Sequence, residues 1–133
     1  MSKHPYFLVP EENILKPWIG IQLGYKKTHK VTLKVPAIVD SGSDVCFCAE
    51  DIGMWLGVVF GKQKSKVFTA ANSTTFVAWC VEMTLYFNGG QYQCPFYFAK
   101  TLPKETPIVL GQIGFFDRFK VTFDYRNREI EVV

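Results

Sequence analysis

The segment that most constrains the fold of this chain is an aspartate placed directly after a short apolar run. Ala37-Ile38-Val39 has the composition of a buried strand, and Asp40-Ser41-Gly42-Ser43 follows it as a polar turn. A carboxylate at the end of a buried strand is costly unless its charge is used or is closely hydrogen-bonded. Serine, glycine and aspartate also favour ordinary turns, so the pattern alone is weak. It indicates a site only if a second motif supports it.

A second motif lies about seventy residues further along the chain. Pro107-Ile108-Val109-Leu110-Gly111 is an apolar run that ends in glycine, and residues 112–119 after it are expected to form a short helix. Together the two motifs resemble those of the retropepsin-like aspartic peptidases, with residues 110–124 more similar to cellular and microbial members than to viral ones. Retroviral members usually carry arginine after this glycine, where the chain has Gln112. Gln112 can still donate a hydrogen bond to the first loop.

The resemblance covers most of the chain and implies its fold. It implies a mostly β, single-domain, closed barrel with one or two short helices, in a chain that dimerises. The closing hairpin is expected from residues 119–124 and 129–132, which alternate around the turn at 125–128. The first sixteen residues lack a clean period and are expected to form an N-terminal arm outside the core, followed by a peptidase domain over residues 17–133.

Hydrophobic periodicity predicts the remaining elements. Apolar and polar residues alternate over 19–23 and 31–35, around a polar turn, which predicts a hairpin whose second strand is interrupted at Pro36. Residues 52–56 have helical spacing, and Gly57 offers a stop. A long alternating strand over residues 77–87 is expected to turn at Gly89-Gly90 into a partner strand.

Hydrolysis by an aspartic dyad needs two carboxylates about 3 Å apart that share one proton. The chain carries one strand-then-Asp-Ser-Gly motif, so a second copy of Asp40 must come from a second chain across a two-fold axis. The sequence therefore predicts a homodimeric aspartic endopeptidase that activates water between two Asp40 carboxylates and cleaves extended, largely apolar peptides. The alternative is a catalytically silent domain of the same fold, serving as a dimerisation or peptide-binding module.

The resemblance gives the neighbours of Asp40 supporting roles. It assigns Ser41 to hydrogen bonding across the two-fold axis. Gly42 allows close backbone approach and unusual dihedral angles, and the Ser43 hydroxyl is placed to donate to the outer oxygen of Asp40. Asp44 is the residue of the first loop that an arginine at position 112 could pair with, and Gln112 cannot form that salt bridge. Gly111 lets the second loop pack under the catalytic strand. The flap that closes over substrate is expected at Thr69, Ala70, Ala71, Asn72, Ser73 and Thr74.

Composition narrows the classes of partner and site. The net charge of +3 comes from scattered residues and two lysine clusters beside turns, so nucleic-acid binding is not expected. No apolar run approaches the roughly 20 residues that span a bilayer, and no signal-type core follows Met1, which predicts a cytoplasmic protein without membrane contact. His4 and His29 have no second histidine at ligand spacing, so neither a metal nor another cofactor is expected. The high aromatic content, 16%, favours oligomerisation.

The four cysteines are expected to remain free thiols. Cys46 and Cys48 lie two apart on one strand and would share a face. With a turn at Gly89-Gly90, Cys80 would lie opposite residue 99 and Cys94 opposite residue 85, so neither forms a disulfide with the other.

Overall fold

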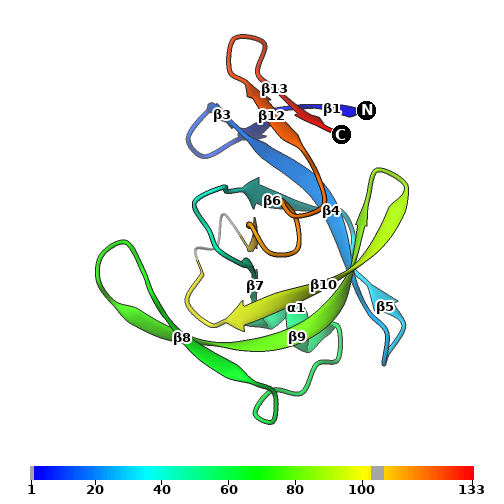
Figure 1. The fold of residues 1–133 in the computed structure, drawn as a ribbon, viewed down its shortest axis with the longest axis vertical. Coiled ribbons are helices and arrows are strands. Elements are labelled where there is room, and N and C mark those ends of the chain that lie inside the picture. Colours follow the sequence, from blue (N-terminus) through cyan, green and yellow to red (C-terminus); the bar gives the residue numbers. More distant parts are fainter. Residues whose placement is uncertain (1, 103–106) are drawn as a thin grey trace.

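A six-stranded closed β-barrel forms the body of the protein (Figure 1). The computed structural model describes residues 2–102 and 107–133. Hydrogen-bonded neighbours follow the order β4-β6-β11-β7-β10-β9, and pairing of β9 with β4 closes the barrel, as the sequence predicts. Short strands β5 and β8 extend β4 and β9 beyond it. The strands of this sheet are β4 (Trp18–Tyr25), β5 (Lys30–Val31), β6 (Val35–Val39), β7 (Cys46–Ala49), β8 (Ser65–Thr69), β9 (Thr75–Phe87), β10 (Gly90–Ala99) and β11 (Ile108–Leu110).

A single core fills the barrel. Alternate residues of the long strands point inward, so that apolar side chains from every barrel strand meet there. Burying each large side chain stabilises the fold by roughly 1.5–3 kcal/mol. Fully buried examples are Ile21, Leu23, Met83, Leu85, Phe96, Phe98, Ile108, Leu110 and Phe115.

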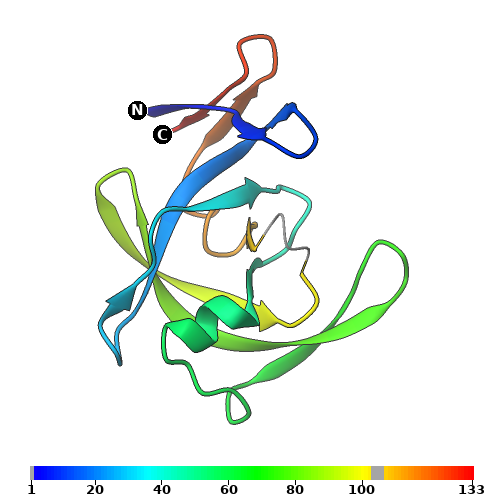
Figure 2. The same cartoon turned by 180° about the vertical axis from the view of Figure 1, so that it is seen from behind.

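Both chain ends lie in a separate three-stranded sheet. β1 (Ser2–Pro5) pairs with β13 (Glu129–Val132), which also pairs with β12 (Val121–Asp124) in the predicted closing hairpin (Figure 2). A small hairpin of β2 (Phe7–Val9) and β3 (Ile14–Lys16) follows β1.

The N-terminal segment therefore differs from the expected arm. Its residues form strands, and Tyr6 and Val9 are buried, Tyr6 within the main core. The expectation of a segment outside the core was wrong in this respect, because the partner strand β13 is more than a hundred residues away and leaves no local signal. Met1, the first residue of the predicted arm, lies outside the described residues.

The hairpin after β4 is broken earlier than predicted. The break falls between β5 and β6, and Pro36 lies inside β6 opposite Gly20. The Thr32 hydroxyl accepts a hydrogen bond from the Leu23 N–H at 3.0 Å, replacing a carbonyl of the strand ladder. Leu33, expected on the buried face, is consequently turned outward and is 86% exposed.

The β9–β10 turn is shifted by one residue from its predicted position. Asn88 and Gly89 occupy it with φ of 51° and 75°, and Phe87 pairs with Gly90. Asparagine tolerates this left-handed conformation, which suits a two-residue hairpin turn. The shift moves the predicted register by two positions. Cys80 faces Tyr97 and Cys94 faces Met83; the prediction that all four cysteines are free is confirmed.

One of the two expected helices is present. Helix α1 (Glu50–Trp55) ends as predicted, with Gly57 at φ +92°. Residues 114–118 form consecutive turns, after Ile113 makes an isolated β-bridge with Val45, instead of the second predicted helix, because Gly114 adopts φ +111°. Phe115 takes the core position of this segment, and Ile113 is 54% exposed.

Candidate active site

The two sequence motifs meet at neighbouring strand ends. β6 and β11 run parallel, with Val39 beside Leu110, and β7 pairs with the other side of β11. β11 therefore lies between the two strands that flank the Asp40 loop (Figure 1). The chain leaves β6 at Asp40 and leaves β11 at Gly111, so the two loops start side by side.

Backbone hydrogen bonds hold the two loops together. The Asp40 N–H donates to the Leu110 carbonyl at 2.9 Å. On the other side, the N–H groups of Gln112 and Ile113 donate to the carbonyls of Ser43 and Asp44 at 2.8 and 3.0 Å. These bonds fix the position of the first loop from both ends.

Gln112 adds a side-chain bond, as expected from the sequence. Its Nε2 donates to the Ser41 carbonyl at 2.6 Å. Gln112 therefore bonds to the backbone of the first loop. The exposed side chain of Asp44 takes no part in this hydrogen bond.

Gly111 is required by the close approach of these loops. A Cβ at this position would lie 2.2 Å from the Val45 carbonyl oxygen and 2.6 Å from that of Ser43. Both atoms are backbone and cannot move aside independently. The absence of a side chain at Gly111 therefore lets the second loop pack against residues 43–45 of the first.

The Asp40 carboxylate lies at the surface of the single chain. Ala37 and Val39 point into the barrel, so Ile38 and Asp40 face outward. Asp40 is exposed, and its Oδ1 accepts a hydrogen bond from the Gly42 N–H at 2.9 Å. Within the single chain, neither backbone strain nor crowding requires a glycine at position 42. Its φ is not positive, and an added Cβ would meet only the Asp40 Oδ1, at 3.2 Å.

The Ser43 hydroxyl has a different acceptor from the one expected. It donates to the Val45 carbonyl at 2.7 Å. The predicted bond from Ser43 to Asp40 was wrong for this structure, because the turn brings the Val45 carbonyl within reach of a hydroxyl that is half-buried.

This contact sets the expected effect of Ser43→Ala. Loss of one part-buried hydrogen bond should lower the free energy of unfolding by about 1 kcal/mol. The acidic limb of any pH–rate profile should stay at its wild-type position, because the lost bond does not involve the carboxylate. Chemical denaturation and peptidase assays across pH measure both quantities. Movement of the acidic limb would mean that Ser43 contacts Asp40 in the working enzyme.

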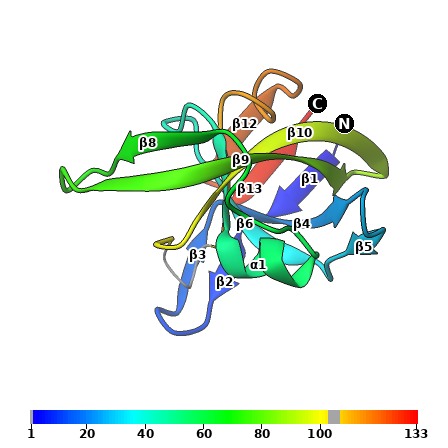
Figure 3. The same ribbon diagram turned by 90° about the horizontal axis from the view of Figure 1, so that it is seen from below.

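The expected flap is a β-hairpin made by β8 and β9. Thr69 pairs with Thr75, and the tip between them is closed by a hydrogen bond from the Ala70 N–H to the Thr74 carbonyl at 2.8 Å. Within the tip, Asn72 Oδ1 accepts from the Thr74 N–H and hydroxyl at 3.1 and 2.6 Å. The hairpin extends well beyond the barrel (Figure 3).

An aromatic cluster at the base of this hairpin was not anticipated from the sequence. Phe47 lies between the buried Cys46 and Cys48 on β7 and therefore points outward, the same side of the sheet as Asp40. Its ring centroid is 4.9 Å from that of Phe68 on β8, which packs on Tyr97 of β10 at 5.1 Å. The alternation of residues along each strand predicts which face of the sheet each ring lies on. Which rings meet depends on the register between strands that are distant in the sequence.

Two further findings concern other kinds of site. Over residues 2–102 and 107–133, no three histidine, cysteine or acidic side chains gather as a metal-binding group. Among these residues, no helix is both long enough and apolar enough to span a bilayer.

The similarity of this protein to known proteins is found in its structure and not in its sequence. No protein-family model matches the sequence, and no curated protein matches it. A retropepsin-like aspartic protease from Rickettsia conorii superimposes with a TM-score of 0.65 at 14% identity, covering 100% of this chain and 99% of that one. EIAV protease, complexed with the inhibitor HBY-793, superimposes with a TM-score of 0.55 at 12% identity over 72% of this chain and 81% of that one. The protein therefore has the retropepsin-like fold.

Proposed function

We propose that this protein is an aspartic endopeptidase whose active site is completed by a second copy of the chain. The observation that carries the proposal is the meeting of the two loops, which holds Asp40 at an exposed strand end beside Gly111. An exposed carboxylate held in this way can approach its own symmetry mate across a two-fold axis. Two such groups at about 3 Å cannot both ionise, so they share one proton.

The proposed reaction uses both carboxylates. The ionised Asp40 takes a proton from water as the water oxygen attacks the peptide carbonyl carbon. The protonated Asp40 of the partner hydrogen-bonds to the carbonyl oxygen and stabilises the tetrahedral intermediate. Proton transfer to the leaving nitrogen then breaks the C–N bond and releases two peptides.

The β8–β9 hairpin and its aromatic base support a peptide substrate. An extended peptide can add backbone hydrogen bonds to a hairpin, with its side chains alternating between two sides. On the barrel side these side chains would meet the outward-facing Phe47, Phe68 and Tyr97. Apolar side chains gain from contact with such a surface, whereas charged ones lose hydration without a partner.

A mixed peptide library tests the activity directly. Purified protein is incubated with the library from acidic to neutral pH, with and without a pepstatin-type inhibitor. Cleavage that the inhibitor blocks supports the proposal, and the cleaved sequences report the side-chain preference. Absence of cleavage at every pH, with peptide binding retained, would favour the silent peptide-binding module instead.

Mixing wild-type chains with Asp40→Asn chains tests the shared site. If each site needs two Asp40 residues, a mixed dimer is inactive, and random pairing in an equal mixture should leave each wild-type chain with about half its activity. Activity per chain should also fall on dilution, because dissociation follows mass action. Activity that stays proportional to the wild-type chain alone, at all concentrations, would exclude a site shared between chains.

A further inference from the structure

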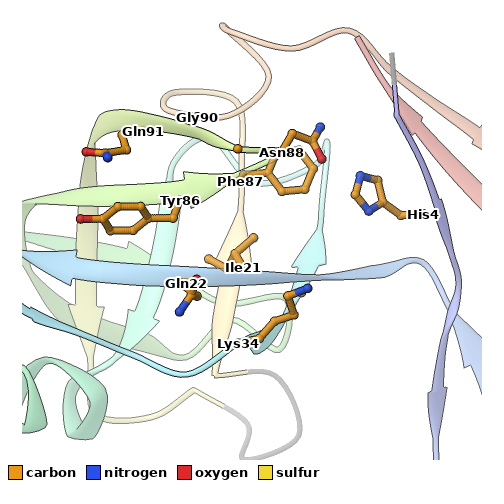
Figure 4. A pocket seen from close by; sticks show the side chains of 11 residues that line it. His4, Ile21, Gln22, Lys34, Tyr86, Phe87, Asn88, Gly90 and Gln91 are labelled. Atoms are coloured by element: carbon orange, nitrogen blue, oxygen red, sulfur yellow. The ribbon is translucent and has the colours of Figure 1, made fainter.

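A second candidate site lies in a cavity that contains none of the residues of the candidate active site. The cavity has a volume of about 480 Å³ and opens between β1, β4 and the β9–β10 turn (Figure 4). Its size falls within the range of small-molecule sites. Its polar lining consists of His4, Gln22, Lys34, Tyr86, Asn88 and Gln91.

The charge that this cavity holds at neutral pH is the Lys34 ammonium. His4 and Lys34 line it, and no aspartate or glutamate does. The Lys34 stem lies against Gly20, where an added Cβ would be 2.7 Å from the Lys34 Cδ, and both residues line the cavity. Among the described residues, the ion pair that forms is between Lys16 and Glu12. Lys34 has no carboxylate partner among these residues. The Lys34 ammonium therefore faces the cavity uncompensated.

The His4 ring is fixed beside this ammonium. Ser2 Oγ lies 2.8 Å from His4 Nε2, and the ring centroid lies 5.0 Å from that of Phe87. Burial lowers the pKa of His4, a hydrogen bond to the Asn88 side chain raises it, and the charge of Lys34 lowers it again. His4 and Lys34 line the same cavity, so the imidazole ring and the ammonium can contact one ligand.

An apolar hollow adjoins the polar cavity and shares lining residues with it. This second hollow, of about 400 Å³, also touches His4, Gly20 and Lys34. Its other side chains include Tyr6, Leu8 and the stacked pair of Phe7 and Trp18, whose ring centroids are 5.8 Å apart, and it too has no acidic residue. The Lys34 ammonium and the His4 ring thus lie where a polar and an apolar space meet.

We propose that this junction binds a small molecule or chain end that carries a carboxylate next to an apolar group. The carboxylate lies between Lys34 and the His4–Asn88 pair, where it supplies the missing negative charge. The apolar group occupies the hollow at Phe7, Leu8 and Trp18, where it leaves water. A fatty acid and the C-terminal residue of a peptide both have this chemistry.

Four probes separate these two sources and test the need for charge. Octanoate represents the fatty acid, and an acetylated tripeptide with a free C-terminal leucine represents the peptide end. Octanamide and the amidated peptide are their neutral counterparts. Titrations followed by the backbone amide NMR signals of Gly89 and Gly90 should give saturable shifts with at least one carboxylate, and the stronger of the two identifies the source. Absence of saturable shifts with both carboxylates, or equal binding of the neutral counterparts, would overturn the proposal.

A matched pair of variants tests the role of Lys34. Lys34→Met keeps the stem over Gly20 and removes the charge, so the carboxylate should bind about tenfold more weakly. Lys62→Met removes the same charge from an exposed loop position outside both hollows and should leave the affinity unchanged. Equal affinities for wild type and Lys34→Met would refute the site. The readout is independent of peptidase activity, so this test stands whatever the outcome at Asp40.

Discussion

Asp40→Asn is expected to give a folded protein that hydrolyses peptides at least about 10³-fold more slowly than wild type, because no carboxylate is left to take the proton from water. Asparagine has nearly the same shape, and its side-chain oxygen can still accept the 2.9 Å hydrogen bond from the Gly42 N–H. The loop should therefore keep its conformation. Steady-state kinetics on a peptide selected from the library measures the loss.

Asp51→Asn is the matched control for this substitution. Asp51 is an exposed residue of helix α1, outside both loops, so the same change of charge there should leave the rate within about twofold of wild type. Circular dichroism and sedimentation of both variants establish that fold and assembly are unchanged. Wild-type activity in Asp40→Asn would remove the proposed mechanism.

Gly111→Ala is expected to have the largest effect on stability of any substitution considered. The new Cβ would lie 2.2 Å from the Val45 carbonyl oxygen and 2.6 Å from that of Ser43, so the two loops must separate. Separation strains the hydrogen bonds from Gln112 and Ile113 as well, and we expect the free energy of unfolding to fall by roughly 3 kcal/mol or more. Thermal and urea denaturation measure this loss.

Gly20→Ala provides the comparison. An added Cβ there is also crowded, but by the flexible stem of Lys34 at 2.7 Å, which can move. Its cost in unfolding free energy should stay near 1 kcal/mol. Similar losses for the two variants would mean that the loops at Gly111 yield more readily than their backbone contacts indicate, and the rigid joining of the two motifs would need to be abandoned.

The fold was predictable from the sequence where local rules decide the outcome. Alternating strands, the stop of α1 at Gly57 and the flap-like hairpin follow from periodicity and turn chemistry. The closed barrel was implied by the family resemblance and is confirmed. The prediction of a second helix was wrong because the local sequence does not show that Gly114 packs against Cys94. A Cβ on residue 114 would lie 2.4 Å from the Cys94 sulfur. Tyr6 was missed as a core residue for a similar reason, since the strand before it, β1, pairs with β13 at the opposite end of the chain.

Some features of the candidate site could likewise be predicted from the sequence, and others could not. The two motifs and the need for Gly111 could be recognised because close backbone approach restricts the residue type. The Ser43 hydroxyl could not be assigned, since a short turn places several acceptors within reach and only the folded loop selects Val45. The Phe47–Phe68–Tyr97 contacts depend on three strands coming together, which requires the register of the whole sheet.

The side-chain link from Gln112 to the Ser41 carbonyl has a consequence for experiments at low pH. Both partners are amide groups, which neither gain nor lose a proton between mildly acidic and neutral conditions, and their bond is little screened by salt compared with an ion pair. An arginine–carboxylate link in its place would weaken as the carboxylate became protonated. With Gln112, the hydrogen bond between the loops should persist from mildly acidic to neutral pH. Changes of rate with pH or ionic strength can then be attributed to the carboxylates and the substrate, and not to separation of the loops.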